Sequence, residues 1–188
     1  MELIEAIRTR RSIGRVKPDP VPCSLIEDIL EAAVWAPDHF HAEPWRFFVM
    51  EGEGRSVLGE AYAQIALQQQ PDLPEGEQAA VREKHHAKAQ RAPVVIAVGA
   101  VLPEEGDVRR REELAATHAA VHNLLLAAHS KGLGAIWRSG EPMYDVRMKQ
   151  AFGLAAKDEI VALVYLGYPA FEPKTPPRAP AADKTVWL

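Results

Sequence analysis

The sequence predicts a helix-covered β-sheet of the α/β or α+β class. Segments with apolar residues at helical spacing alternate with short, continuous apolar segments that are typical of buried strands. The strand-like segments are too few to close a barrel. Because the chain has 188 residues, we expect residues 1–188 to form a single domain with a sizeable core.

The N-terminal part predicts two helices joined by a proline-rich connection. Apolar residues at helical spacing indicate a short helix over residues 2–9. The prolines within 17–22 exclude a helix there. Ser24 with Glu27 three residues later is the pattern of a capping box, so we expect the second helix to start at Ser24 and to stop before Pro37.

The middle of the chain predicts two strands with helical segments between them. Residues 46–50 are rich in aromatic and β-branched side chains, as in a strand, and residues 55–68 suit a helix. Residues 71–90 are charged and poor in large apolar side chains, so we expect a mobile helical flap. Residues 94–98 are continuously apolar and predict a buried strand.

A long helix dominates the C-terminal half. Residues 112–130 carry Ala, Leu, Val and His around nearly the whole circumference, so we expect a central buried helix that ends with a glycine cap at Gly132. A short strand at 135–137, a short helix near 144–151 and an apolar strand at 160–167 follow.

The tail beyond Pro169 is rich in proline and ends in Lys184-Thr185-Val186-Trp187-Leu188, whose last three residues are apolar. We expect 184–188 to form an edge strand. A stiff segment with an apolar end is better explained by docking than by free motion, and a partner subunit is the natural candidate.

Composition argues against several classes of protein. The net charge is −4 and the isoelectric point about 6.0, so no basic field is available for nucleic acid. No apolar stretch reaches the roughly 20 residues of a membrane span, and no signal peptide is visible. Cys23 is the only cysteine, which excludes an internal disulfide and fits a reducing cytoplasm.

Nucleophile and metal motifs are weak. Ser139 lies in Trp-Arg-Ser-Gly rather than in Gly-x-Ser-x-Gly, so the esterase pattern fails. His118, His122 and His129 share one face of the long predicted helix and could ligate a metal. No Glu completes a His-Glu-x-x-His motif, so a solvated groove or a subunit interface is the favoured interpretation.

Three segments combine rigid backbone with groups suited to a flat, charged ligand. Arg10-Arg11-Ser12 suits a phosphate, although cations at a helix end also complement the helix dipole. Residues 37–45 form a polar loop bracketed by prolines, and a structural turn is the alternative. Residues 132–140 join Arg138 to glycines that allow close backbone approach, or they form a capped helix and an edge strand.

In this order and spacing, the segments resemble the nitroreductase family of FMN-dependent NAD(P)H oxidoreductases, and in particular its small, compact branch. The resemblance covers nearly the whole chain. Its motifs are Arg10-Arg11-Ser12, then Ala36-Pro37-Asp38-His39 running to Pro44-Trp45-Arg46-Phe47, then Arg91-Ala92-Pro93 before a strand, and finally Gly132-Leu133-Gly134-Ala135-Ile136-Trp137-Arg138-Ser139-Gly140.

The resemblance implies a three-layer α+β fold, with a mainly antiparallel central sheet flanked by helices. It also implies a homodimer that exchanges C-terminal segments and holds two FMN molecules at its interface. By this analogy Arg10 and Ser12 hold the phosphate and ribityl chain, and His39 reaches the flavin across the interface. The implied cofactor-binding residues are Arg10, Arg11, Ser12, Trp35, Pro37, Asp38, His39, Trp137, Arg138, Ser139 and Gly140.

Two departures from the family pattern affect the expected flavin contacts. His41 and Glu43 stand where many members carry Asn and Gln, at the pyrimidine edge of the flavin. Trp35 occupies a position that is basic in some relatives of this branch. If Trp35 contributes no cation, Arg10 and Arg138 must carry more of the phosphate contact.

The chemistry implied by the resemblance needs no catalytic side chain. The flavin accepts a hydride from NADH or NADPH and passes it to an electron-poor acceptor, such as a nitroaromatic or a quinone, in a ping-pong sequence. The protein supplies binding and electrostatics, with Arg138 as the candidate cation beside N1 of the reduced flavin. A flavin-binding carrier or sensor without useful turnover is the alternative.

Overall fold

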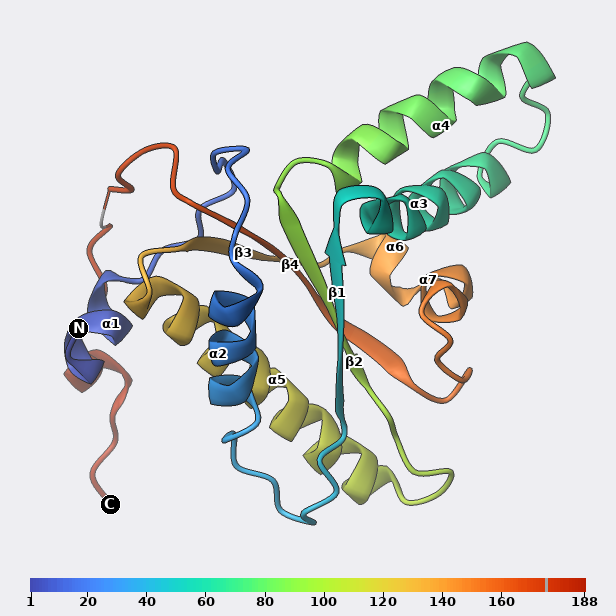
Figure 1. The fold of residues 1–188 in the computed structure, drawn as a ribbon. Coiled ribbons are helices and arrows are strands. Elements are labelled where there is room, and N and C mark those ends of the chain that lie inside the picture. Colours follow the sequence, from blue (N-terminus) through green and yellow to red (C-terminus); the bar gives the residue numbers. More distant parts are fainter. Residues whose placement is uncertain (175) are drawn as a thin grey trace.

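An antiparallel sheet with helices on both faces forms the centre of the structure (Figure 1). The computed structural model describes residues 1–174 and 176–188. Within them, four strands pair in the order β1-β2-β4-β3, and each neighbouring pair is antiparallel. The strands are β1 (Trp45–Glu51), β2 (Val94–Ala100), β3 (Gly134–Arg138) and β4 (Glu159–Gly167). This arrangement confirms the expected α+β class, the antiparallel sheet and the helical layers.

Strand β2 shows why continuous apolar runs predicted the central strands. All seven of its residues are buried, and alternate side chains point to opposite faces. Val94, Ile96 and Val98 pack against α2 (Cys23–Ala33) and α5 (Asp107–Ser130). Val95 and Ala97 join a second cluster, which includes residues of α3 (Ser56–Gln68) and α7 (Val146–Ala151). Both faces of β2 are therefore covered, so a polar side chain on it would have to be buried.

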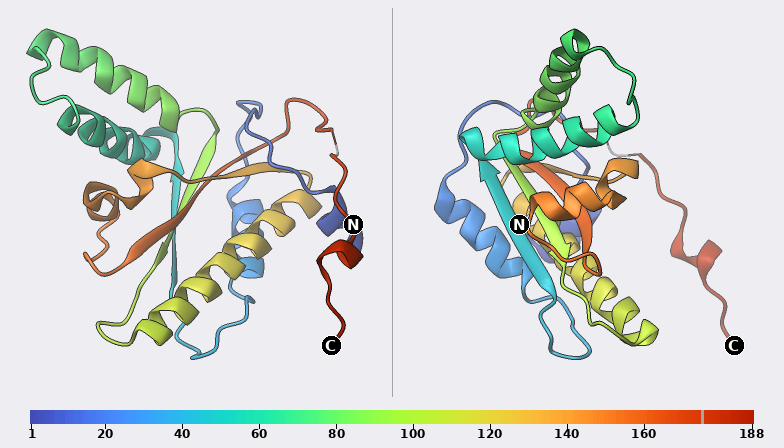
Figure 2. Two further views of the ribbon diagram at one scale, coloured as in Figure 1. Left: turned by 180° about the vertical axis from the view of Figure 1, so that it is seen from behind. Right: turned by 90° about the vertical axis from the view of Figure 1, so that its right-hand side faces the viewer.

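Helix α4 (Glu75–Ala89) confirms the helix expected within 71–90 and forms an antiparallel hairpin with α3 that projects beyond the sheet (Figures 1 and 2). Gly59 permits the close approach, because a Cβ there would lie 2.9 Å from Cγ of His86. Arg82 forms an ion pair with Glu60 across the hairpin. The mobility of this segment stays a prediction.

Helix α5 begins at Asp107, five residues before the expected start, and ends in a glycine cap as predicted. Gly132 has a φ of +79°, and the N–H of Leu133 donates to the carbonyl of Ala128 at 2.9 Å. The prediction that this helix is buried on all sides was wrong within a single chain. His118 and His122 are exposed, and α2 and the sheet cover the other side of the helix.

The expected capping box at the start of α2 was also wrong. The helix begins at Cys23, and the carbonyl of Pro22 accepts the N–H groups of Leu25 and Ile26. Ser24 therefore lies inside the first turn and its side chain caps nothing. The other short elements are α1 (Leu3–Thr9), η1 (Gly52–Arg55), α6 (Glu141–Tyr144) and, at the C-terminus, η2 (Ala181–Lys184). A helix was expected near 144–151, and two short helices, α6 and α7, cover this region.

The C-terminal end does not form the predicted edge strand. After η2, residues 185–188 pair with no strand in the described chain, and Trp187 is 92% exposed. Figure 2 shows this segment away from the sheet. The outer edge of β3 is instead met by the N-terminal segment, where Ser12 forms a parallel bridge with Ala135. That edge is therefore not free to accept the tail.

Candidate functional site

The N-terminal arginine turn and β3 lie side by side, so two of the three predicted segments converge. The N–H of Ile13 donates to the carbonyl of Ala135 at 2.9 Å. Farther along, a Cβ on Gly14 would lie 3.3 Å from Nη2 of Arg138. The missing side chain of Gly14 therefore leaves room for the guanidinium of Arg138 at the edge of the sheet.

One end of this edge carries a cluster of cations, Arg10, Arg11 and Arg178. Burial lowers the pKa of Arg10, and the charges of Arg11 and Arg178 lower it further. Nε of Arg11 is buried and has no partner among the described residues. None of the three arginines takes part in an ion pair found in the described chain, and gathered cations of this kind are suited to a strongly anionic ligand such as a phosphate. Sequence reasoning missed Arg178, because only the folded tail brings it close to Arg10.

His129 belongs to the same end of the site. Its Nε2 lies 2.8 Å from Oγ1 of Thr9, whose hydroxyl also lies 2.7 Å from the carbonyl of Glu5. The hydroxyl has one proton, which it donates to that carbonyl, so it accepts the Nε2–H of His129. Burial, Arg10 and Arg11 lower the pKa of His129 and favour its neutral form.

The other end of the edge borders a cavity of about 400 Å³. Arg138 lies 5.3 Å from the centre of the Tyr165 ring, and its Nε is buried without a partner in the described chain. Trp137 also borders the cavity, but its Nε1–H donates to the carbonyl of Val161 at 3.0 Å and its ring stacks on His118. The exposed residues Ser139 and Gly140 complete this rim of the cavity.

The third predicted segment lies elsewhere in the same chain. The loop between α2 and β1 is near the start of α5, whereas α1 lies near its end (Figure 1). Asp38 accepts the backbone N–H groups of Phe40 and Glu43 at 3.3 and 2.7 Å, which fixes the loop. Pro37 and His39 are exposed. One chain alone therefore does not bring Pro37, Asp38 and His39 to the arginines.

Trp35, at the start of this loop, is 79% exposed. His41 and Glu43 both adopt left-handed backbone conformations, with φ of 51° and 46°. Non-glycine residues with positive φ are uncommon and often mark functional loops. The loop is therefore a fixed, exposed structure.

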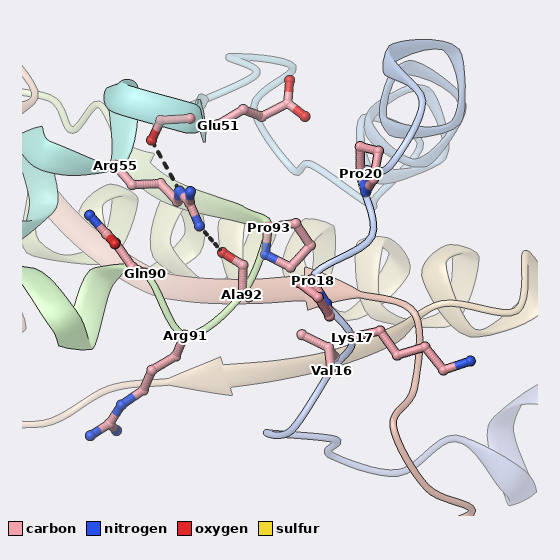
Figure 3. Close-up of a pocket in the computed structure, with 11 residues that line it drawn as sticks. Val16, Lys17, Pro18, Pro20, Glu51, Arg55, Gln90, Arg91, Ala92 and Pro93 are labelled. Atoms are coloured by element: carbon pink, nitrogen blue, oxygen red, sulfur yellow. Dashed lines mark hydrogen bonds between the residues drawn. The ribbon is translucent and has the colours of Figure 1, made fainter.

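A second cavity, of about 610 Å³, lies between the proline-rich connection and the start of β2 (Figure 3). Its cations do not converge. Arg55 donates to the carbonyls of Gly52 and Ala92 at 3.1 and 2.6 Å, while the side chains of Lys17 and Arg91 point away from the cavity. The edge of β3, with its unpartnered guanidinium nitrogens, is the better candidate.

Within residues 1–174 and 176–188, no cluster of three His, Cys, Asp or Glu side chains has the arrangement of a metal site. His118 and His129 have separate contacts, with Trp137 and Thr9. No helix in the same residues is both long and apolar enough to cross a bilayer.

The fold and the site together define an α+β protein with arginine side chains gathered along the edge of its sheet. The chain belongs to the nitroreductase family, whose family model matches residues 7–168. This confirms the resemblance found in the sequence.

Individual relatives support the same assignment. YfhC of Bacillus subtilis, provisionally described as an NAD(P)H nitroreductase, is 36% identical over 97% of this chain and 92% of its own length. A nitroreductase-like protein from Bacillus cereus matches 100% of this chain and 96% of its own, with a TM-score of 0.86 and 29% identity. A provisionally assigned nitroreductase from Desulfovibrio desulfuricans was solved in complex with FMN. It matches 100% of this chain and 97% of its own, with a TM-score of 0.74 and 27% identity.

Proposed function

We propose that this protein is an FMN-dependent oxidoreductase that takes a hydride from NADH or NADPH and reduces an electron-poor acceptor, such as a nitroaromatic or a quinone. The observation that carries the proposal is the edge of β3, which has unneutralised cations at both ends. The family membership and the FMN-bound relative support the choice of cofactor.

The side chains fit the requirements of FMN. The cluster of Arg10, Arg11 and Arg178 suits the phosphate, and the exposed hydroxyl of Ser12 suits the ribityl chain. The buried, unpartnered Nε of Arg11 has a donor to offer. When bound, the flavin supplies the hydride chemistry. The protein then needs to bind the flavin, orient it and stabilise the negative charge of its reduced form.

Arg138 is our candidate for stabilising the negative charge of reduced flavin. Its guanidinium is fixed over the Tyr165 ring, next to the space left by Gly14. A cation that is positioned before the reaction stabilises developing charge without reorganisation. Trp137 on β3, and Ser139 and Gly140 directly after it, would border the flavin ring.

A homodimer would complete the site. The exposed loop with Trp35, Pro37, Asp38 and His39 lies far from the arginines of its own chain, so it is available to a partner's site. The exposed apolar residues 186–188 are suited to exchange onto that partner. The only cysteine, Cys23, is free, which agrees with a cytoplasmic location.

The test is reduction and reoxidation of the purified holoprotein without oxygen. NADH or NADPH should bleach the flavin absorption, and a quinone or nitroaromatic should restore it. Initial rates at several acceptor concentrations should give parallel double-reciprocal plots, as expected for a ping-pong sequence. Retained FMN that neither NADH nor NADPH bleaches would instead favour the carrier or sensor function.

A further inference from the structure

Among the described residues, three cations and no carboxylate line the cavity of about 400 Å³ at the end of β3. Lys88, Arg91 and Arg138 come from the last turn of α4, from the connection to β2, and from β3. None of them takes part in the ion pairs found in the described chain. The chain as a whole has more acidic than basic residues, so this local excess of positive charge is notable.

Aromatic rings help to hold two of these cations at the wall of the cavity. Nζ of Lys88 lies 5.8 Å from the centre of the Tyr62 ring, and Arg138 packs over Tyr165. Arg91 borders both cavities, and Figure 3 shows its side chain pointing away from the larger one. Burial lowers the pKa of Lys88, and the charges of Lys84 and Arg91 lower it further, so a bound anion would relieve their repulsion.

The rest of the lining suits a flat, apolar body. Ile136, Met143 and Leu163 contribute aliphatic and thioether surface, and the tyrosine rings contribute aromatic surface. A volume of about 400 Å³ can hold a substituted aromatic ring. Convergent cations on an apolar lining are typical of a site for an aromatic anion.

We propose that this cavity selects acceptors that carry an anionic group, such as a carboxylate, on an aromatic ring, and that Lys88 and Arg91 determine this specificity. The proposal rests on the proposed function, because the acceptor has to lie beside the flavin. The phosphate of FMN is assigned to Arg10, Arg11 and Arg178, and reduced flavin to Arg138, which leaves Lys88 and Arg91 for the acceptor. Helix α4 thereby contributes to acceptor choice.

The test compares 4-nitrobenzoate with 4-nitrobenzamide, which has nearly the same shape but no charge. The wild-type holoenzyme should favour the benzoate in kcat/KM. Lys88→Met should reduce this preference about 3- to 10-fold, mainly by raising KM for the benzoate. The factor is small because an ion pair between partly exposed groups contributes little binding energy. Lys84→Met is the matched control, since it removes the same charge one turn earlier on α4 from an exposed position outside the cavity, and it should leave most of the preference intact.

Equal kcat/KM for the two acceptors in the wild type, or a preference that Lys88→Met leaves unchanged, would overturn the proposal. The 2′-phosphate of NADPH is the other source of an anion. If Lys88→Met changed the NADPH-to-NADH ratio and not the acceptor ratio, the acceptor assignment would be wrong.

A measurement of acceptor binding distinguishes failure of this cavity proposal from failure of the proposed function. Calorimetry on wild-type protein should show tighter binding of 4-nitrobenzoate than of 4-nitrobenzamide, and Lys88→Met should remove the difference. The same titration on protein without FMN still tests the cavity if no flavin is retained. Retained, reducible FMN with no discrimination between the two compounds would refute the cavity proposal alone.

Discussion

Replacing Arg10 by alanine should weaken FMN binding without lowering the stability of the apoprotein. The guanidinium of Arg10 forms no ion pair in the described chain, and the charges of Arg11 and Arg178 oppose its own. The apoprotein should therefore unfold at the same urea concentration as the wild type or at a slightly higher one. Arg8→Ala is the matched control, because Arg8 is an exposed arginine in the last turn of α1, the helix that Arg10 directly follows.

The expected loss in affinity follows from the contact with the phosphate. A hydrogen bond to a charged group contributes about 1.5–3 kcal/mol, so losing one weakens FMN binding roughly 10- to 150-fold. Quenching of FMN fluorescence on titration with apoprotein measures this Kd. Added salt should weaken wild-type binding more than binding to Arg10→Ala, because one ionic contact is already missing in the variant.

Two results would refute this reasoning. Arg10→Ala protein that binds FMN as tightly as Arg8→Ala would remove Arg10 from the phosphate site. A loss of more than about 1 kcal/mol in the stability of the apoprotein would show that Arg10 has a structural role, since most surface substitutions change stability by less.

Three further perturbations test the fold and its electrostatics by urea unfolding. Gly59→Ala should destabilise by about 1–3 kcal/mol through the clash with His86, whereas Gly76→Ala, with open space around it in α4, should stabilise by up to about 1 kcal/mol. Asp158→Ala should cost about 2–4 kcal/mol, because the buried carboxylate accepts two backbone N–H groups at 3.0 and 2.9 Å; a loss below about 1 kcal/mol would contradict this. The pKa of His129 is lowered in the folded protein, so below about pH 6.5 the unfolded chain binds more protons than the folded one. The free energy of unfolding should therefore fall as the pH falls through this range. His129→Gln should lose less of its stability over the same range than the wild type.

The sheet could be predicted because burial leaves a direct mark on the sequence. Strand β2 is covered on both faces, and its apolar run could not be solvent-exposed. The start of α2 was harder to predict. Pro22 is its N-cap residue, and it caps the helix through its backbone carbonyl, which no side-chain pattern reveals. The edge strand expected at the end of the tail does not form within one chain, where Ser12 already pairs with Ala135 on the outer edge of β3.

The site was only partly accessible from residue patterns. Arg10 and Arg138 are separated by more than a hundred residues, and no spacing rule brings them together. Their association followed from the family resemblance, and the bridge between Ser12 and Ala135 supplies its physical basis. Arg178 was missed, because a lone arginine among prolines has no recognisable motif.

The most direct test of the account is size-exclusion chromatography of the protein after incubation with FMN, recorded at a protein and a flavin wavelength. The account predicts that flavin absorption elutes with the protein at the mass of two chains, with one FMN per chain. A colourless protein peak, or elution as one chain with no flavin, would contradict it.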